Sequence, residues 1–366
     1  MTSTEIDKRI HQNCFGANVT SSRQTRIQSL MSRVEEYNLR TMTYASGVVR
    51  KSTNDQTFLE ILDYVPKARA ERKANRPYAL YLGYALAQSS QSASVDLTAT
   101  IPLSAAVELA NCTITYIYDR IIDDDEEVSG TLSLHRKYGV SLALLAGDAL
   151  TSVARKIVLG CVADHKNALH IIEEFEQIFF DCDYGQFLDV TFGERESARQ
   201  EDAETINDAR TGQFIRRASE IGALYAGVDD DTHAIIHEAF HYYGRAVQDA
   251  NDLADVVPRA NMPGSKYQDI YLWKKTKPLI FALEMVDKGQ RADLQHVLGN
   301  PEATTDQLYD ASRIVEQCGA FARAEADLET TIEKGMQVLQ RLPESDIRQE
   351  TEIYFDYVRC AHKITL

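Results

Sequence analysis

The chain has 366 residues, of which 44% are hydrophobic, and its formal net charge is −16 at pH 7. This length is ample for a large buried core. An acidic surface repels phosphate backbones, so we expect no nucleic-acid partner. The six cysteines form no CxxC pair, which argues against a zinc or redox motif. No apolar signal core and no run of eighteen apolar residues occur, so we expect a cytoplasmic protein without a membrane span.

The pattern along the chain indicates helices. Residues 1–55 are polar and mixed, and we interpret them as an N-terminal extension or outer helices. Residues 56–366 contain no repeat or linker and are expected to form one domain. No proline occurs between Pro102 and Pro258, and an interior proline costs a helix roughly 3 kcal/mol. Apolar residues recur every three to four positions, as in 103–114, which predicts an all-α domain of ten or more helices.

A first acidic cluster follows an apolar helix. Asp119 and Asp123 are four residues apart and therefore share one helix face, where two carboxylates could bind a hard cation such as Mg²⁺. Asp119 has apolar and aromatic neighbours, among which an unpaired acid would be costly. We interpret residues 124–127, which are all acidic, as a helix end that runs into a solvated loop.

A second cluster lies about 130 residues further on. Gln248, Asn251, Asp252 and Asp255 offer oxygen donors on neighbouring helical positions, although an exposed polar face would show the same pattern. On two facing helices of a bundle, the two clusters could hold several cations between them. Such cations could hold a diphosphate and take up the charge that develops when it ionises. The carbocation left behind would need a dry, apolar pocket.

Seven short motifs in a fixed order extend these observations. They are Lys73-Ala-Asn-Arg-Pro77, Asp119-Arg-Ile-Ile-Asp123, His135-Arg-Lys-Tyr-Gly139 with Leu145-Ala-Gly-Asp-Ala-Leu150, Gly185-Gln-Phe-Leu-Asp189, Arg210-Thr211, Gln248-Asp-Ala-Asn-Asp-Leu-Ala-Asp255 and Asp269-Ile-Tyr-Leu-Trp-Lys-Lys-Thr-Lys-Pro278. Over residues 70–285 the chain thereby resembles the trans-isoprenyl diphosphate synthases, the polyprenyl synthetase family. The resemblance implies an all-α isoprenoid-synthase bundle around a deep central cavity, and usually a homodimer.

The resemblance also implies residue roles. The metal ligands would be Asp119, Asp123, Asn251, Asp252 and Asp255, which would hold three Mg²⁺ ions once an allylic isoprenyl diphosphate is bound. The catalytic positions would be Gln186, Gln248, Arg210, Thr211 and Lys274, of which Arg210 and Lys274 would hold the allylic diphosphate. The other substrate-binding positions would be Lys73 and Arg76 for a second diphosphate, together with Asn111, Thr115, Tyr118 and Arg120.

Departures from the family pattern gather at the same positions. Arg120 and Asn251 each stand where the family has aspartate, and Arg120 could contact a diphosphate or pair with Asp124. Val128 and Ser129 replace two diphosphate-binding arginines, and neither can clamp a phosphate with two hydrogen bonds.

Three interpretations remain open after these departures. The first is prenyl transfer to isopentenyl diphosphate or to a non-diphosphate acceptor, which the retained Lys73 and Arg76 favour. The second is a class I terpene cyclase, which the missing arginines favour. The third is a weakly active or non-catalytic subunit of a hetero-oligomeric synthase, which Arg120 and Asn251 would fit.

Overall fold

The computed structural model describes residues 21–70, 75–90, 96–128, 131–193, 199–256 and 267–361, and most of them are helical. This confirms the predicted all-α class. The elements are α2 (Ser21–Val49), α3 (Gln56–Ala70), α4 (Asn75–Ser90), η1 (Leu97–Thr100), α5 (Ile101–Thr113), η2 (Ile114–Tyr118), α6 (Asp119–Ile122), β1 (Glu127–Val128), β2 (Thr131–Leu132), α7 (Leu134–Tyr138), α8 (Val140–Val162), α9 (Ala168–Gly193), α10 (Gln200–Asn207), η3 (Asp208–Gly212), α11 (Gln213–Ala226), α12 (Asp230–Val256), α13 (Gln268–Tyr271), α14 (Lys277–Met285), α15 (Lys288–Val297), α16 (Thr305–Gln317), α17 (Ala320–Leu339) and α18 (Asp346–Ala361).

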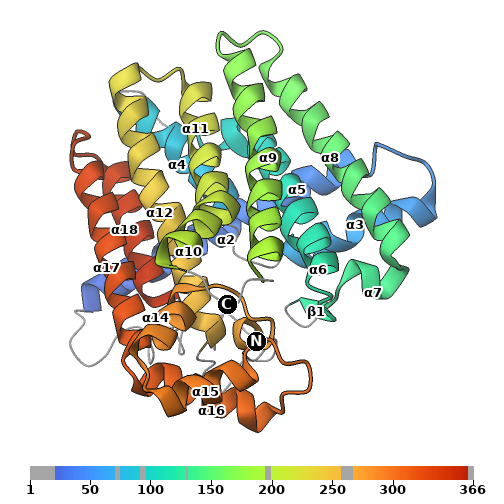
Figure 1. Ribbon diagram of the computed structural model, residues 1–366. Coiled ribbons are helices and arrows are strands. Elements are labelled where there is room, and N and C mark those ends of the chain that lie inside the picture. Colours follow the sequence, from blue (N-terminus) through green and yellow to red (C-terminus); the bar gives the residue numbers. More distant parts are fainter. Residues whose placement is uncertain are drawn as a thin grey trace.

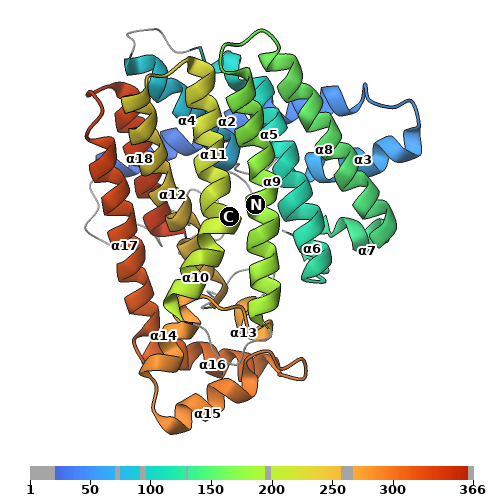
Figure 2. The ribbon, with the colours of Figure 1, turned by 45° about the horizontal axis from the view of Figure 1, so that its top comes forward.

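The long helices lie side by side and form the body of the molecule (Figure 1). Helix α11 packs against α4, α9 and α12, while α5 packs against α8 and α2. The short helices α14, α15 and α16 gather at one end of this body in both views (Figure 2). The two strands form only a small antiparallel ribbon, in which Val128 pairs with Thr131. The loop between α13 and α14 lies at the end of the bundle where α14, α15 and α16 gather.

Helices α4 and α11 touch through their backbones. A Cβ atom on Gly83 would lie 2.0 Å from the carbonyl oxygen of Ser219, and one on Gly222 would lie 1.9 Å from that of Leu80. No side chain larger than hydrogen fits at such distances. These two glycines therefore set the spacing of the two helices at the centre of the bundle.

An aromatic cluster joins the C-terminal helix to the core. Tyr243 on α12 stacks on Phe355 of α18, with ring centroids 4.6 Å apart, and Tyr78 on α4 lies 5.2 Å from Tyr354. The hydroxyl of Tyr78 donates to the buried carboxylate of Glu350. Tyr78 thereby combines a large apolar contact with a satisfied polar group. Helix α18 is consequently part of the main core.

One continuous helical stretch in the described residues, Leu97–Ile122, is long and apolar enough by composition to cross a membrane. However, 67% of its most apolar window is buried inside the protein, and core helices often pass this test. Tyr37 on α2 reaches this stretch and forms a 2.6 Å hydrogen bond with Ser104. The stretch thus packs as a central helix of the bundle, and it ends at the first acidic cluster.

Candidate active site

Two π-helical turns position the charged residues of the site. Turn η2 ends directly before Asp119, whose N–H bonds to the carbonyl of Ile114, five residues earlier. Turn η3 contains Arg210. A π turn holds one extra residue and is frequent at functional sites. Gly185 on α9 allows η3 to approach, because a Cβ there would lie 2.7 Å from Cγ of Arg210.

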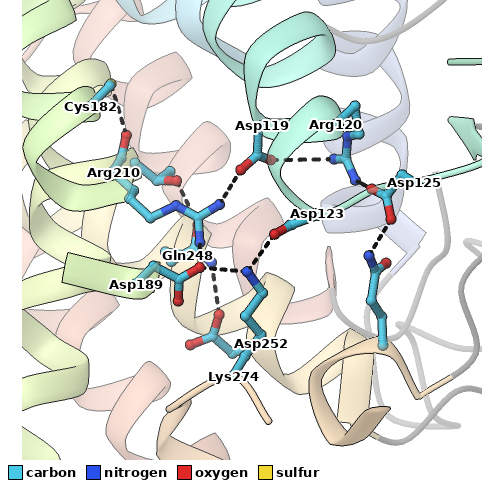
Figure 3. A network of polar contacts seen from close by, with 12 residues as sticks. Asp119, Arg120, Asp123, Asp125, Cys182, Asp189, Arg210, Gln248, Asp252 and Lys274 are labelled. Atoms are coloured by element: carbon cyan, nitrogen blue, oxygen red, sulfur yellow. Dashed lines mark hydrogen bonds and ion pairs between the residues drawn. The ribbon is translucent and has the colours of Figure 1, made fainter. Parts of the chain in front are cut away.

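Arg210 and Lys274 join three carboxylates into one network (Figure 3). Arg210 donates to Oδ1 of Asp119 at 2.8 Å and to Oδ2 of Asp189 at 3.1 Å. Lys274 Nζ donates to Oδ1 of Asp123 at 2.8 Å and to Oδ2 of Asp189 at 2.5 Å. Both acids of the first cluster, Asp119 and Asp123, are therefore in contact with cations from elements distant in the sequence.

Arg120 takes part in the same network. Its Nη1 donates to Oδ2 of Asp125, and its Nη2 lies 3.9 Å from Oδ2 of Asp119. On the other side, Gln268 of α13 donates to Oδ1 of Asp125 at 2.5 Å. Asp125 thereby connects the first cluster to α13.

Residues 124, 126 and 127 are exposed, as expected for a solvated loop, but Asp125 and one of the two alternatives for Arg120 differ from the expectation. Arg120 does not pair with Asp124, which is exposed and pairs with Arg136 at 2.7 Å. Nor is Asp125 solvated, since only 12% of its side chain is exposed. The cause is the positive φ of Asp124, 54°, which turns the chain so that the N–H of Asp125 bonds to the carbonyl of Arg120 at 3.0 Å.

The second cluster forms a separate chain of hydrogen bonds. Thr211 donates to Oε1 of Gln248 at 2.5 Å, and Gln248 donates in turn to Oδ1 of Asp252 at 2.7 Å. Asn207 donates to Oδ2 of Asp252 at 2.8 Å. Asn251 is solvent-exposed and does not join these hydrogen bonds. The structure thus brings Thr211, Gln248 and Asp252 together but leaves Asn251 outside.

Among the described residues, Asp252 and Asp255 of the second cluster form no ion pair within 4 Å. Burial raises the pKa of Asp252 to about 7. Burial also raises the pKa of Asp255 to about 6, although the positive charge of Arg120 opposes this rise. The pKa of Asp269 is raised by burial and by the charges of Asp255 and Asp252, and its Oδ2 is buried without a hydrogen-bond partner among the described residues. This wall of the site is therefore short of positive charge.

The donor set fits magnesium. Carboxylate oxygens are the ligands that Mg²⁺ prefers, and the unpartnered Oδ2 of Asp269 shows that a buried acceptor is available. Within the described parts of the chain, no three acidic, imidazole or thiolate groups converge on one point as a preformed metal site. Such a site is not preformed because Arg210 and Lys274 already contact the oxygens of Asp119 and Asp123.

The residues predicted to bind a second diphosphate are only partly described. Lys73 lies outside the described residues, as does Ser129, which stands in place of a family arginine. Arg76 is half-buried, with its guanidinium 4.8 Å above the ring of Phe214, and its Nε has no hydrogen-bond partner in the part of the chain that the structure describes. Asn111 is buried and donates to Glu108 at 3.1 Å. Arg76 therefore retains a free donor, while the amide group of Asn111 is directed to another core residue.

The remaining predicted positions lie near the first cluster and on α9. Thr115 is half-buried within η2. Tyr118 crosses α8 at Gly147, where a Cβ would lie 2.5 Å from its ring, and its hydroxyl donates to Asp148 at 2.5 Å. Gln186 has a buried amide nitrogen without a hydrogen-bond partner among the described residues. That amide is consequently available to a ligand.

Sequence reasoning assigned no role to several residues of the site. Asp189 contacts both Arg210 and Lys274. In the sequence, only its position at the end of the Gly185–Asp189 motif pointed to it. Lys277 pairs with the buried Asp249 at 2.9 Å, which neutralises one acid of α12. Asn207 and Asp125 carry no pattern of their own, since their roles depend on contacts between distant elements.

Comparison with known proteins gives concordant results. A family model described as polyprenyl synthetase matches residues 55–315. The geranylfarnesyl diphosphate synthase of Aeropyrum pernix is 29% identical over 264 residues, which cover 70% of this chain and 81% of that protein.

Two solved structures share the fold. The polyprenyl synthase from Caulobacter crescentus CB15, complexed with calcium and isoprenyl diphosphate, has a TM-score of 0.80 at 20% identity, covering 91% of this chain and 98% of that one. The geranylgeranyl pyrophosphate synthase from Corynebacterium glutamicum, complexed with isoprenyl diphosphate and magnesium, has a TM-score of 0.77 at 18% identity with the same coverage. At these identities the likeness establishes the fold.

Proposed function

This chain belongs to the polyprenyl synthetase family, and from that membership we propose that it transfers an allylic prenyl group to isopentenyl diphosphate and releases pyrophosphate. The chain is an enzyme of the prenyltransferase class. The similar protein of Aeropyrum pernix is named a geranylfarnesyl diphosphate synthase, which supports chain elongation over the terpene cyclase and the non-catalytic subunit.

The observation that carries this proposal is the contact of two cations with the first acidic cluster. Arg210 lies 2.8 Å from Asp119, and Lys274 lies 2.8 Å from Asp123. A diphosphate is a more highly charged anion than a carboxylate, so it competes for both cations. The oxygens of Asp119 and Asp123 would then be available to hold magnesium, together with those of Asp252 and Asp255. Bound Mg²⁺ would neutralise the charge that develops on the leaving pyrophosphate.

The roles of the other residues follow from their donors. Arg210 and Lys274 hold the leaving group by charge-assisted hydrogen bonds while the allylic carbon–oxygen bond breaks. Gln186 offers its unpartnered amide, and Thr211 fixes the orientation of Gln248 next to the reacting carbons. The double bond of isopentenyl diphosphate then forms a new carbon–carbon bond to the allylic carbon, and the resulting cation loses a proton to the released pyrophosphate.

We assign the second diphosphate to Arg76 and Lys73. The free Nε of Arg76 supports this role, because a buried guanidinium donor without a partner is costly unless a ligand accepts from it. Asn111 keeps its hydrogen bond to Glu108, and we assign it a place in the wall of this substrate site. We place Arg120 among the substrate-binding residues on the side of the first cluster. The resemblance implies three Mg²⁺ ions in the loaded site.

The test is an incubation of the full chain with Mg²⁺ and geranyl, farnesyl or geranylgeranyl diphosphate, each with and without isopentenyl diphosphate. Products are identified by mass spectrometry, and pyrophosphate release is measured in parallel. We expect a longer prenyl diphosphate only when isopentenyl diphosphate is present. A hydrocarbon or alcohol from one substrate alone would identify a cyclase, and the absence of any product would support the non-catalytic subunit.

A matched pair of variants connects this activity to the site. Asp123→Ala removes an acid that Lys274 contacts, and we expect pyrophosphate release to fall at least about 100-fold. Asp124→Ala alters the neighbouring acid, whose side chain is 75% exposed, and should retain activity. Equal activity of the two variants would contradict the role of Asp123.

We propose that the chain forms a homodimer through helices α8 and α9. These helices lie next to each other in both views (Figures 1 and 2). They carry many of the large apolar side chains that remain exposed, namely Val140, Leu142, Leu144, Leu145, Leu159, Leu169, Phe180, Tyr184, Phe187 and Val190. Exposed apolar surface on this scale is typical of a protein–protein contact.

Two further assignments remain proposals. The family match begins at residue 55, which supports a division between residues 1–55 and a catalytic domain over residues 56–366. Cys112, Cys161, Cys182 and Cys318 are free thiols, which suits a reducing compartment such as the cytoplasm.

A further inference from the structure

The turn that carries Lys274 is attached to the first acidic motif at two points (Figure 3). Lys274 Nζ donates to Oδ1 of Asp123 at 2.8 Å, at the end of the turn. Gln268 Nε2 donates to Oδ1 of Asp125 at 2.5 Å, at its beginning. The first contact breaks when Lys274 turns to a diphosphate, whereas the second leaves both of its residues in place.

Gln268 and Lys274 belong to one hydrogen-bonded backbone unit. The N–H of Leu272 bonds to the carbonyl of Gln268 at 2.8 Å, and the N–H of Lys274 bonds to that of Asp269 at 2.9 Å. A displacement of Gln268 is therefore transmitted through the turn to the backbone of Lys274.

Strained backbone marks the same contact residues. Within the residues that the structure describes, three residues other than glycine have a positive φ, namely Asp124, Tyr267 and Trp273, at 54°, 61° and 52°. They come directly before Asp125, Gln268 and Lys274, respectively. Left-handed conformations of residues with a Cβ atom persist only where the surroundings impose them, and they gather at functional sites. The strain thus falls at the two attachment points of the turn.

Asp125 is held on both of its oxygens. Its Oδ2 accepts from Arg120 while its Oδ1 accepts from Gln268, and only 12% of its side chain is exposed. A carboxylate bonded in this way has a defined orientation. An aspartate at position 120, as in the family motif, would instead repel Asp125. Arg120 therefore orients the acceptor of Gln268.

We propose that Asp125 and Gln268 are positioning residues, which hold the turn against the first cluster while Lys274 exchanges Asp123 for the allylic diphosphate. Without this second attachment, the same exchange would release the turn from the cluster. A lysine on a fixed turn loses less conformational freedom on binding, so the attachment strengthens diphosphate binding without touching the ligand. This inference rests on the proposed function, because it concerns the same diphosphate.

The experiment measures the binding of inorganic pyrophosphate to the full-length chain by isothermal titration calorimetry in the presence of Mg²⁺. We expect Gln268→Ala to weaken binding about 3- to 10-fold, the size expected for the loss of one hydrogen bond. The control Gln295→Ala changes an exposed glutamine of α15 and should match the wild type.

A second background separates positioning from a general effect on the fold. In Lys274→Gln, the further change Gln268→Ala should cause no additional loss of affinity, because Gln268 acts through Lys274. An equal loss in both backgrounds would overturn the inference, since Gln268 would then act independently of Lys274.

Asp125→Asn carries the same test if Gln268→Ala does not fold. It keeps the shape of the side chain but leaves one acceptor oxygen for two donors, so we expect a similar loss of affinity. Wild-type affinity in both variants would overturn the inference while leaving the proposed function intact. If the wild-type chain bound no pyrophosphate with Mg²⁺, the proposed function itself would fail, and the inference with it.

Discussion

At the scale of single residues, the backbone next to Lys274 is under strain. Trp273 has a φ of 52°, in the left-handed region that bulky residues rarely adopt. This conformation costs about 1–2 kcal/mol for a residue with a Cβ atom. The ring of Trp273 is covered by Nζ of Lys275, 3.8 Å from its centroid. Such strain persists where the surroundings impose it, often at functional sites, and here it precedes a lysine that contacts two acids.

Trp273 is the only tryptophan in the chain, so its fluorescence reports on the site alone. We predict that pyrophosphate with Mg²⁺ changes this emission, because the adjacent Lys274 exchanges its carboxylate partners for the ligand. Lys274→Gln should weaken pyrophosphate binding by about 10- to 100-fold, since a hydrogen bond from a charged group contributes about 1.5–3 kcal/mol. The titration is followed at the tryptophan emission maximum.

The control for this titration is Lys288→Gln, which removes an exposed lysine at the start of α15. It should bind pyrophosphate as the wild type does. If Lys274→Gln bound pyrophosphate with unaltered affinity, Lys274 would have only the structural role of neutralising Asp123 and Asp189.

At the scale of elements, the contact between α4 and α11 depends on residues without side chains. We predict that Gly222→Ala lowers the free energy of unfolding by about 1–3 kcal/mol, because its Cβ would lie 1.9 Å from a carbonyl oxygen and the helices would have to separate. Gly47→Ala on α2 meets nothing within 4 Å. It should instead stabilise the protein by about 0.5–1 kcal/mol.

Urea unfolding followed by circular dichroism measures both glycine variants. A destabilised Gly47→Ala would indicate that helix propensity is outweighed by some effect other than crowding. A neutral Gly222→Ala would show that α4 and α11 can move apart without loss, which the close packing of protein interiors argues against.

The elements also show what the sequence could and could not predict. Helical periodicity was sufficient for the all-α class and for the shared face of Asp119 and Asp123, because both are local properties. The contact of Asp119 with Arg210 joins residues 91 positions apart and depends on two π turns, for which the sequence had no visible signal. The burial of Asp125 could not be predicted for a similar reason. The left-handed backbone of Asp124, directly before it, turns the chain so that the side chain of Asp125 points into the site.

At the scale of the whole molecule, the exposed apolar residues of α8 and α9 predict a dimer. Leu145→Glu combined with Phe180→Glu places charges on residues that are 58% and 66% exposed. A buried, unpaired charge in an interface is unfavourable, so we expect the double variant to be monomeric by light scattering after size-exclusion chromatography. Leu39→Glu, on α2 and 54% exposed, should leave the oligomeric state unchanged. A monomeric wild type would contradict the proposed assembly.

Ligand binding at the site should stabilise the entire bundle, because the network joins α6, α9, η3 and the loop before α14. Arg210 and Lys274 already satisfy the carboxylates, so Mg²⁺ alone has few free ligands, and pyrophosphate alone would bring uncompensated negative charge next to the acids. We therefore predict that either one alone raises the melting temperature little. Together they should stabilise the protein by about 2.7 kcal/mol at one hundred times the dissociation constant.

Differential scanning calorimetry with Mg²⁺, with pyrophosphate and with both measures this coupling. Asp123→Asn should abolish the joint effect, because it removes a carboxylate that the ion needs once Lys274 turns to the diphosphate. Asp124→Asn, at the exposed neighbouring position, should keep it. A full shift with Mg²⁺ alone would mean that the carboxylates are accessible despite their cations. The exchange of partners by Arg210 and Lys274 would then not be the step that admits the metal.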